Sequence, residues 1–285
     1  MKLHLLDGTY ELFRSYFGAP KRKSPSGQEV GAIAGIIQST LGLLSDGVTH
    51  IGAAFDSEIE SYRNDIYPGY KSSEGVPEEI LEQFPLAERA MKALGVVVWP
   101  MVEYEADDAI ATAAHRWAGD VEQVVVMTPD KDLSQCVSGD HVIAFDRRKR
   151  EARNEDGVWE KFGVAPASIP DYLGLVGDSA DGLPGVPGWG AKSASTVLAR
   201  YGHIEAIPLE ASLWQVNVRG AERLVGALRE HMAGALLYRY LATLRLDVPL
   251  TEKLSDLKWK GVPKAEYQAL CDELGFDGLR NRPWS

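Results

Sequence analysis

The chain has 285 residues, 45% of them hydrophobic, and a formal net charge of −11 at pH 7. This length and composition indicate a globular protein with one large or two smaller domains. No apolar run reaches membrane-spanning length, and Asp7 interrupts the N-terminal apolar run too early for a signal peptide. We therefore expect a cytoplasmic protein that makes no membrane contact.

The two cysteines form no metal motif and the six histidines lack ligand spacing, which argues against a zinc site. The acidic net charge by itself argues against a nucleic-acid partner. It is a weak test, because bound cations can offset a local group of acids. The positions of the acids are therefore the more informative feature.

Two short apolar runs near the N-terminus each end in an aspartate. Residues 2–6 precede Asp7, and residues 50–55 precede Asp56. Each run is typical of a strand, and an aspartate at a strand end is often only a turn residue. If the two strands are parallel in one sheet, both aspartates emerge at the edge where ligands bind in open α/β sheets.

The segments between and after these strands predict helices. Residues 10–17 form an aromatic helix whose Arg14 has two open interpretations: a snorkelling arginine on a buried helix, or a phosphate contact near the acids. Residues 30–45 have the small and apolar pattern of a helix packed on a sheet. The tyrosine-rich segment 61–71 can cover a substrate, and a helix is predicted from residue 78 to about residue 94.

Five further candidate carboxylates flank a predicted helix–strand unit between residues 103 and 133. They are Glu105, Asp107, Asp108, Asp130 and Asp132. The first three lie at a predicted helix start, where acids are ordinary because they complement the helix dipole. The last two follow an apolar run at 124–127 that is typical of a strand, and capping does not explain them. Further strands are predicted at 96–99 and 141–145.

So many like charges cannot lie close together in ionised form without cations to compensate them. Oxygen ligands without histidine or cysteine suit Mg²⁺ or Mn²⁺. The pattern therefore indicates a hydrolase that cleaves phosphodiester bonds with two metal ions.

The second half of the chain changes character. The hydrophilic run 147–157 is predicted to be a solvated hairpin or linker, and we place a domain boundary near it. Farther on, the glycine-rich turn 185–190 enters a predicted helix near Ala191, and such a turn offers backbone N–H groups to a phosphate. Asp178 and Asp181 precede this turn and bring the candidate acids to nine.

Five motifs occur in order between about Leu3 and Ala206. They are LLDGTYELFRSYF, AAFDSEIESYRNDIYPGYK, EYEADD, VMTPDKDL and DYLGLVGDSADGLPGVPGWGAKSA. With these motifs the chain resembles the 5′-nuclease family, which comprises the 5′-3′ exonuclease domain of bacterial DNA polymerase I and stand-alone flap endonucleases. The resemblance implies an α/β fold, in which a PIN-like nuclease domain with a mainly parallel central sheet spans residues 1–160 and carries a helical arch at about 62–95. An all-helical domain of the helix-three-turn-helix type, related to helix-hairpin-helix DNA-binding motifs, would span residues 161–285.

The resemblance also implies roles for individual residues. The metal ligands would be Asp7, Asp56, Glu105, Asp107, Asp108, Asp130, Asp132, Asp178 and Asp181. Lys71 and Arg14 would act in catalysis beside the scissile phosphate, and Arg63 and Tyr70 would contact DNA. The duplex-binding turn, which in relatives holds a monovalent cation such as K⁺, maps to residues 185–193. Its candidate DNA contacts are Gly185, Gly188, Gly190, Lys192 and Ser193.

Some positions depart from the family pattern. The family's G-D-x-S-D-N reads GDSADG at residues 177–182, which keeps both acids, and Glu74 stands where an arginine is common. We recognise no further resemblance in residues 207–285, and we expect their helical runs to complete the helical domain. Since no polymerase region follows, we expect a stand-alone, monomeric nuclease.

The expected function is a 5′-3′ exonuclease or flap endonuclease that uses two or more Mg²⁺ or Mn²⁺ ions. It would act near the 5′ ends of structured DNA in replication and repair, at the bacterial nucleoid. One alternative is a PIN-type ribonuclease, although a minimal one would end soon after Phe145. Another is a DNA-structure-binding protein with decayed catalysis, although all nine acids persist. An activity assay distinguishes the three.

Overall fold

The computed structural model describes residues 1–284, which form two compact units. Unit 1 comprises residues 1–61, 73–128 and those from 246 onward, and unit 2 comprises residues 62–72 and 129–245. The functional division at residue 160 and the arch at about 62–95 stay predictions.

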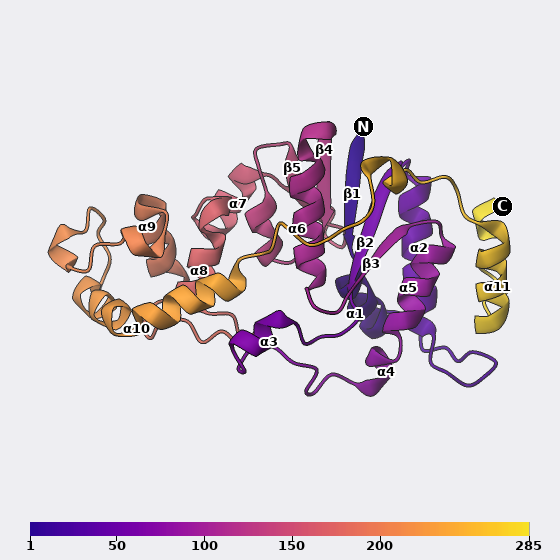
Figure 1. The fold of residues 1–285 in the computed structure, drawn as a ribbon, viewed down its shortest axis with the longest axis horizontal. Coiled ribbons are helices and arrows are strands. Elements are labelled where there is room, and N and C mark those ends of the chain that lie inside the picture. Colours follow the sequence, from indigo (N-terminus) through magenta and orange to yellow (C-terminus); the bar gives the residue numbers. More distant parts are fainter. Residues whose placement is uncertain (285) are drawn as a thin grey trace. The chain divides into compact units, whose positions relative to one another are not determined.

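Unit 1 is built on four parallel strands in the order β3-β2-β1-β4 (Figure 1). They are β1 (Lys2–Asp7), β2 (His50–Asp56), β3 (Val97–Met101) and β4 (Gln123–Met127). All four lie where the apolar runs predicted strands. Asp7 is in register with Ala54, and Leu6 with Met127, so the carboxyl ends of β1, β2 and β4 share one edge.

Helices cover this sheet. Those of unit 1 are α1 (Gly8–Gly18), α2 (Gly31–Ser45), α4 (Glu78–Leu81), α5 (Phe84–Ala93), α6 (Ala106–Trp117) and α11 (Lys264–Leu274). The helix α6 packs on β1 and β2, α1 packs on β2, and α5 packs on β2 and β3. Because α2 is apolar on most of its surface, it is buried against α1 and α5.

The prediction of one continuous helix from residue 78 to about 94 is wrong in one respect. The segment is divided into α4 and α5, with Glu82 and Gln83 between them. Pro85 lies in the first turn of α5. Proline lacks an N–H donor and its ring collides with the carbonyl of the preceding turn, so it begins a helix more readily than it continues one.

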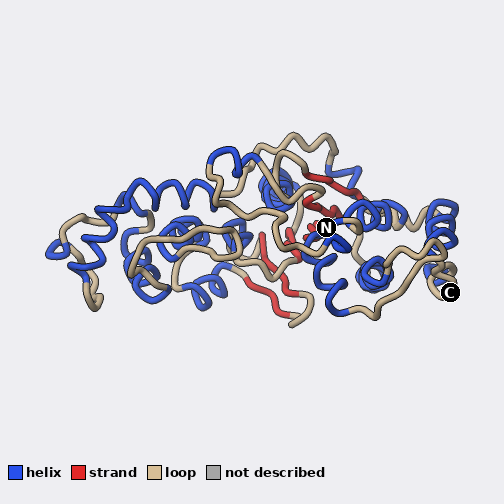
Figure 2. Tube along the Cα trace, turned by 90° about the horizontal axis from the view of Figure 1, so that it is seen from below, coloured by secondary structure: helices blue, strands red, loops and turns tan. Residues whose placement is uncertain are grey.

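Unit 2 is mainly helical, and helices are blue in Figure 2. Its helices are α3 (Tyr62–Ile66), α7 (Glu155–Phe162), α8 (Ile169–Val176), α9 (Ala191–Tyr201) and α10 (Ala221–Ala242). The helix α8 packs against α9 and α10 around a core that includes Trp189 and Leu228. The strands β5 (Val142–Asp146) and β6 (Glu151–Arg153) form an antiparallel hairpin, as one interpretation of the run 147–157 predicted.

Short 3₁₀ helices connect these elements. They are η1 (Ala118–Asp120), η2 (Asp132–Cys136), η3 (Pro166–Ser168), η4 (Ile204–Ala206), η5 (Ala211–Leu213), η6 (Leu254–Leu257) and η7 (Arg282–Trp284). Within the described residues, no helix combines the length and the apolar character that a membrane span requires.

The end of the chain returns to unit 1, which the sequence did not lead us to expect. Residues from 246 onward do not complete the helical unit. Instead, Val248 N donates to Thr112 Oγ1 at 3.2 Å, and the Leu250 carbonyl accepts from Arg116 at 2.8 Å. These bonds attach the segment to α6, whose N-terminus carries three of the candidate acids.

The start of α1 should tolerate no side chain at Gly8. A Cβ there would lie 2.5 Å from the Phe55 ring and 2.7 Å from the Ala54 carbonyl oxygen, so α1 would have to shift. We expect Gly8→Ala to lower the free energy of unfolding by about 1–3 kcal/mol. Gly42→Ala is the control, because nothing lies near its Cβ and it should stabilise α2 by up to about 1 kcal/mol. Urea denaturation measures both, and a Gly8→Ala variant as stable as the parent would contradict this packing.

Candidate metal centre

Asp7 lies where β1 ends and α1 begins. Its side chain is the N-cap of α1, since Oδ1 accepts from Tyr10 N at 2.8 Å. The other oxygen, Oδ2, accepts from Thr128 Oγ1 at 2.8 Å. Two fixed donors therefore set the orientation of this buried carboxylate, as supporting bonds do for metal ligands.

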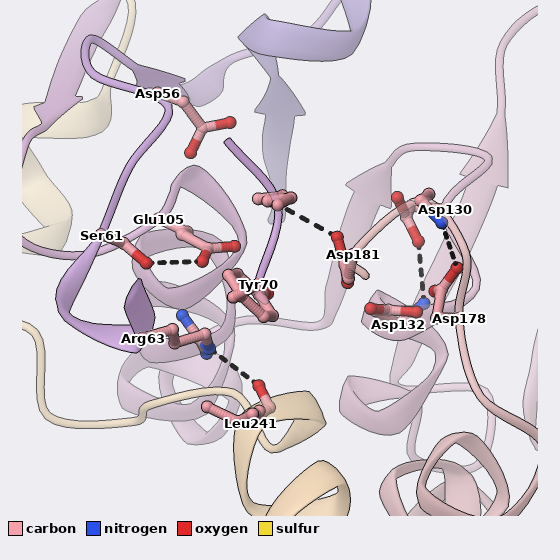
Figure 3. Close-up of polar contacts among 12 residues, drawn as sticks. Asp56, Ser61, Arg63, Tyr70, Glu105, Asp130, Asp132, Asp178, Asp181 and Leu241 are labelled. Atoms are coloured by element: carbon pink, nitrogen blue, oxygen red, sulfur yellow. Dashed lines mark hydrogen bonds and ion pairs between the residues drawn. The ribbon is translucent and has the colours of Figure 1, made fainter. Parts of the chain in front are cut away.

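Asp56 and Glu105 are linked at the same edge of the unit 1 sheet. Asp56 Oδ1 accepts from Ala106 N, at the start of α6, at 2.7 Å. Glu105 is the N-cap of α6 and accepts from Ser61 Oγ at 2.7 Å, as Figure 3 shows. Asp108 is fully buried and accepts from Glu105 N at 3.1 Å, which completes a capping box. Asp107, on the same first turn, is half-buried.

Three carboxylates of unit 2 converge. One oxygen atom each from Asp132, Asp178 and Asp181 lies within 4.8 Å of the others (Figure 3). Asp132 begins η2, and Asp178 exchanges two backbone hydrogen bonds of 2.8 Å with Leu183. The Asp181 carbonyl accepts from Lys71 N at 3.0 Å. The group is therefore held by backbone contacts as well as by sequence proximity.

The electrostatics of this group indicate a cation. Asp132 is 7% exposed, and its Oδ1 has no hydrogen-bond partner among residues 1–284. Burial, together with the charges of Asp130 and Asp181, raises the pKa of Asp132 well above its usual range. The exposed Asp130 accepts from Asp132 N at 2.9 Å. A buried carboxylate oxygen without a donor, facing two other carboxylates, fits a hard divalent cation.

Two lysines accompany these acids. Lys131 Nζ is 2.5 Å from Asp178 Oδ2, and Lys71 Nζ is 3.7 Å from Asp181 Oδ1. Burial lowers the pKa of Lys131, but its bond to Asp178 and the charge of Asp132 outweigh burial and raise it. Sequence reasoning did not single out Lys131, although its position between two aspartates was the available signal.

Five of the nine predicted acids thus lie in unit 1 and four in unit 2. In each group the candidate metal ligands are carboxylate oxygens. The assignment of each acid as a metal ligand stays a prediction. Arg14 donates through Nη2 to Glu11, which is buried, and to Ser39 Oγ at 2.9 Å. One third of the Arg14 side chain remains exposed, so the phosphate contact also stays a prediction.

Arg63 and Tyr70 do not lie on the surface as DNA contacts would. Arg63 is 0% exposed, and its guanidinium donates to the Leu241 carbonyl at 2.8 Å (Figure 3). It also donates to the Thr243 carbonyl at 3.3 Å. Tyr70 is buried in the core of unit 2. The structure therefore assigns Arg63 to holding the end of α10 and Tyr70 to packing, and we do not propose either as a DNA contact.

The glycine-rich turn precedes α9 as predicted. Gly185 has φ +70°, and a Cβ there would lie 2.5 Å from the backbone of Val176 and Gly177. Gly188 has φ +81°, and a Cβ there would meet only the Arg223 side chain, at 3.9 Å. Ser193 Oγ accepts from Gly190 N at 3.0 Å and caps the helix. The turn borders a pocket of 550 Å³, whose lining residues are Gly188, Gly190, Ala191, Lys192, Ser193, Thr196, Asn217, Val218 and Arg219.

Comparison with known families matches nearly the whole chain. A family model described as 5′-3′ exonuclease, N-terminal resolvase-like domain, matches residues 2–163. A second, described as 5′-3′ exonuclease, C-terminal SAM fold, matches residues 164–265.

Curated relatives and solved structures are also similar. DNA polymerase I of Mycobacterium leprae is 34% identical to this chain, and the alignment covers 98% of this chain and 31% of the polymerase. DNA polymerase I of Bacillus caldotenax is also 34% identical, and the alignment covers 98% of this chain and 32% of that polymerase. The chain thus spans about a third of the length of these relatives. The T5 5′-exonuclease with bound zinc ions has a TM-score of 0.64 at 18% identity, covering 85% of this chain and 89% of its own. The catalytic core of Rad2 in complex with a DNA substrate has a TM-score of 0.64 at 14% identity, covering 99% and 90%.

Replacement of Arg63 should affect stability rather than binding. Arg63→Met leaves buried carbonyls without their donor, so we expect the free energy of unfolding to fall by about 1–3 kcal/mol. The exposed Arg200, which donates to Gln215, provides the control. Arg200→Met should change the free energy of unfolding by less than about 0.5 kcal/mol. The salt dependence of DNA binding should be the same for both variants and the parent. If DNA binding depends less steeply on salt in Arg63→Met alone, Arg63 contacts a phosphate after all.

Proposed function

Since the chain belongs to the 5′-3′ exonuclease family, we propose that it is a divalent-metal-dependent nuclease that hydrolyses phosphodiester bonds near the 5′ ends and flaps of structured DNA. The observation that carries the proposal is the convergence of Asp132, Asp178 and Asp181, in which one buried oxygen, Asp132 Oδ1, has no donor among the residues that the structure describes. Mg²⁺ and Mn²⁺ suit such oxygen ligands.

Each unit would hold divalent ions with its own acids. In unit 2, Asp132, Asp178 and Asp181 would hold a divalent ion, with Asp130 beside them. In unit 1 the ligands would be Asp7, Asp56, Glu105 and Asp107, while Asp108 would orient Glu105 through the capping box. When bound, two such ions lower the pKa of an attacking water and stabilise the leaving oxygen.

The lysine and arginine side chains would offset the negative charge of the phosphate. Lys71 is partly exposed and lies near Asp181, so its ammonium can approach a phosphate bound at unit 2. One third of the Arg14 side chain is exposed, and Glu11 and Ser39 hold its Nη2 in place. Such fixed positive charges stabilise the transition state more than the ground state because they need no reorganisation.

The partner would be DNA that carries duplex beside the 5′ end. The groove at the start of α9 combines a helix N-terminus with Lys192 and Arg219, which suits a backbone phosphate and does not read base sequence. We propose that Gly188, Gly190, Lys192 and Ser193 form the duplex contact, with K⁺ bound at residues 185–193. Gly185 is buried against the backbone of Val176 and Gly177, so we assign it to the shape of the turn and not to DNA. We also propose that the protein acts as a monomer.

A cleavage assay tests this function. Purified protein is incubated with a labelled 5′-flap DNA in Mg²⁺, Mn²⁺ or EDTA, and with the matching RNA. We expect cleavage of the DNA with either metal and none in EDTA. Cleavage of RNA alone would identify a ribonuclease, and binding without cleavage would identify a protein with decayed catalysis.

The convergent acids should carry the activity. Asp132→Ala removes the central carboxylate, so we expect the single-turnover rate on the flap to fall by about two to three orders of magnitude. Glu222→Gln removes one exposed acid of unit 2 on α10 and should leave the rate unchanged. An Asp132→Ala variant that cleaves at the parent rate in Mg²⁺ would show that this group is not the metal centre.

The groove at α9 should bind duplex electrostatically. We expect Lys192→Ala to reduce the slope of log affinity against log salt by about one, the value for one lost phosphate contact. Lys264→Ala, on α11 of unit 1, removes the same charge from an exposed site and should leave the slope unchanged. Fluorescence anisotropy with a duplex-bearing DNA at several salt concentrations measures both. Equal slopes for Lys192→Ala and the parent would place the duplex elsewhere.

A further inference from the structure

One lysine lies inside the acid group of unit 2. Lys131 separates Asp130 from Asp132 in the chain, and its ammonium nitrogen is 2.5 Å from Asp178 Oδ2. The other oxygen of Asp178 accepts from Ala180 N at 3.1 Å. Both oxygens of Asp178 are therefore engaged by the protein itself.

Asp132 offers a cation less resistance than Asp178 does. Its Oδ1 is buried without a hydrogen-bond partner in the described part of the chain. A divalent ion therefore meets no donor from these residues at Asp132 Oδ1, whereas at Asp178 Oδ2 it meets an ammonium group. Asp181 is paired with Lys71, but at 3.7 Å this ammonium lies farther from its carboxylate than Lys131 lies from Asp178.

We propose that Lys131 is an internal counter-ion of this group and competes with the divalent cation for Asp178. The inference rests on the proposed function, because the cation is the one that the nuclease would use. Mg²⁺ binds carboxylate oxygens at about 2.0–2.1 Å, so an ammonium at hydrogen-bond distance lies in the space that the ion would take. The two positive charges also repel each other at such short range. Binding of a divalent ion through Asp178 therefore requires the ammonium to leave.

The ammonium can leave without unfolding the turn. The Lys131 side chain is 36% exposed, whereas that of Asp178 is 6% exposed. The lysine stem is flexible, and its ammonium is readily hydrated. The turn itself is held independently by the bond from Asp132 N to Asp130 Oδ1. Lys131 thus stabilises the metal-free acids and raises the metal concentration needed to fill the site.

Metal affinity measures this competition without any cleavage. Metal-stripped full-length protein is titrated with Mn²⁺ in the absence of DNA, and free Mn²⁺ is followed by electron paramagnetic resonance. In Lys131→Met and Lys131→Gln we expect the affinity of at least one site to rise by about tenfold or more, the effect of one unit charge removed from a few ångströms away. Lys149→Met, on the exposed turn between β5 and β6, removes the same charge outside the acid group. It should change the affinity by less than about twofold because solvent screens it.

The contact with Asp178 can be isolated by a second substitution. In an Asp178→Asn background, Lys131→Met should raise the affinity less than it does in the parent, since the direct contact is already lost and only the repulsion between the ammonium and the metal remains. Unchanged or weaker Mn²⁺ affinity in both Lys131 variants would overturn the proposal, because the ammonium would then be indifferent to the metal or help to hold it. A parent that binds no Mn²⁺ would overturn the proposed function as well. A parent that binds Mn²⁺ but cleaves no DNA, with tighter binding in the Lys131 variants, would contradict the function alone and support the role of Lys131.

Discussion

Repulsion between carboxylates is the constraint on which the candidate site of unit 2 depends. Asp132, Asp178 and Asp181 bring oxygen atoms within 4.8 Å of one another, and two of these side chains are almost completely buried. Such a group needs compensation from a proton, an internal cation or a bound metal. The raised pKa of Asp132 favours a proton on that carboxylate, and Lys131, in short contact with Asp178, is an internal cation. The same repulsion that raises the free energy of the metal-free group gives the group affinity for a divalent ion.

The fold holds these acids in place with backbone hydrogen bonds and helix caps, in addition to the contacts of Lys131 and Lys71 with the acids of unit 2. In unit 1, Asp7 and Glu105 are N-caps, so forming α1 and α6 fixes them. In unit 2, the paired bonds between Asp178 and Leu183 and the bond from Asp132 N to Asp130 do the same. Each unit therefore positions its own acids by its local structure.

Much of this arrangement could be predicted from local sequence, because it depends on strand ends and helix starts. Asp7 and Asp56 end buried apolar runs, and in unit 1 both lie at the carboxyl edge of the parallel sheet, as expected.

Arg63 was misassigned because its partner at Leu241 is 178 positions away, and no local pattern reports such a contact. For the same reason the return of residues 246 onward to α6 was not foreseen. The break before α5 could have been predicted from the sequence, because Pro85 lies in the first turn of this helix. The roles assigned to single acids through family resemblance remain predictions.

Thermal unfolding of metal-stripped protein, with and without millimolar Mg²⁺ or Mn²⁺ at matched ionic strength, is the most direct test that these acids form a cation site. A ligand that binds only the folded state raises the melting temperature by mass action. We expect a rise that saturates with metal concentration and is lost in Asp132→Ala. A melting temperature that does not respond to either ion would contradict the account.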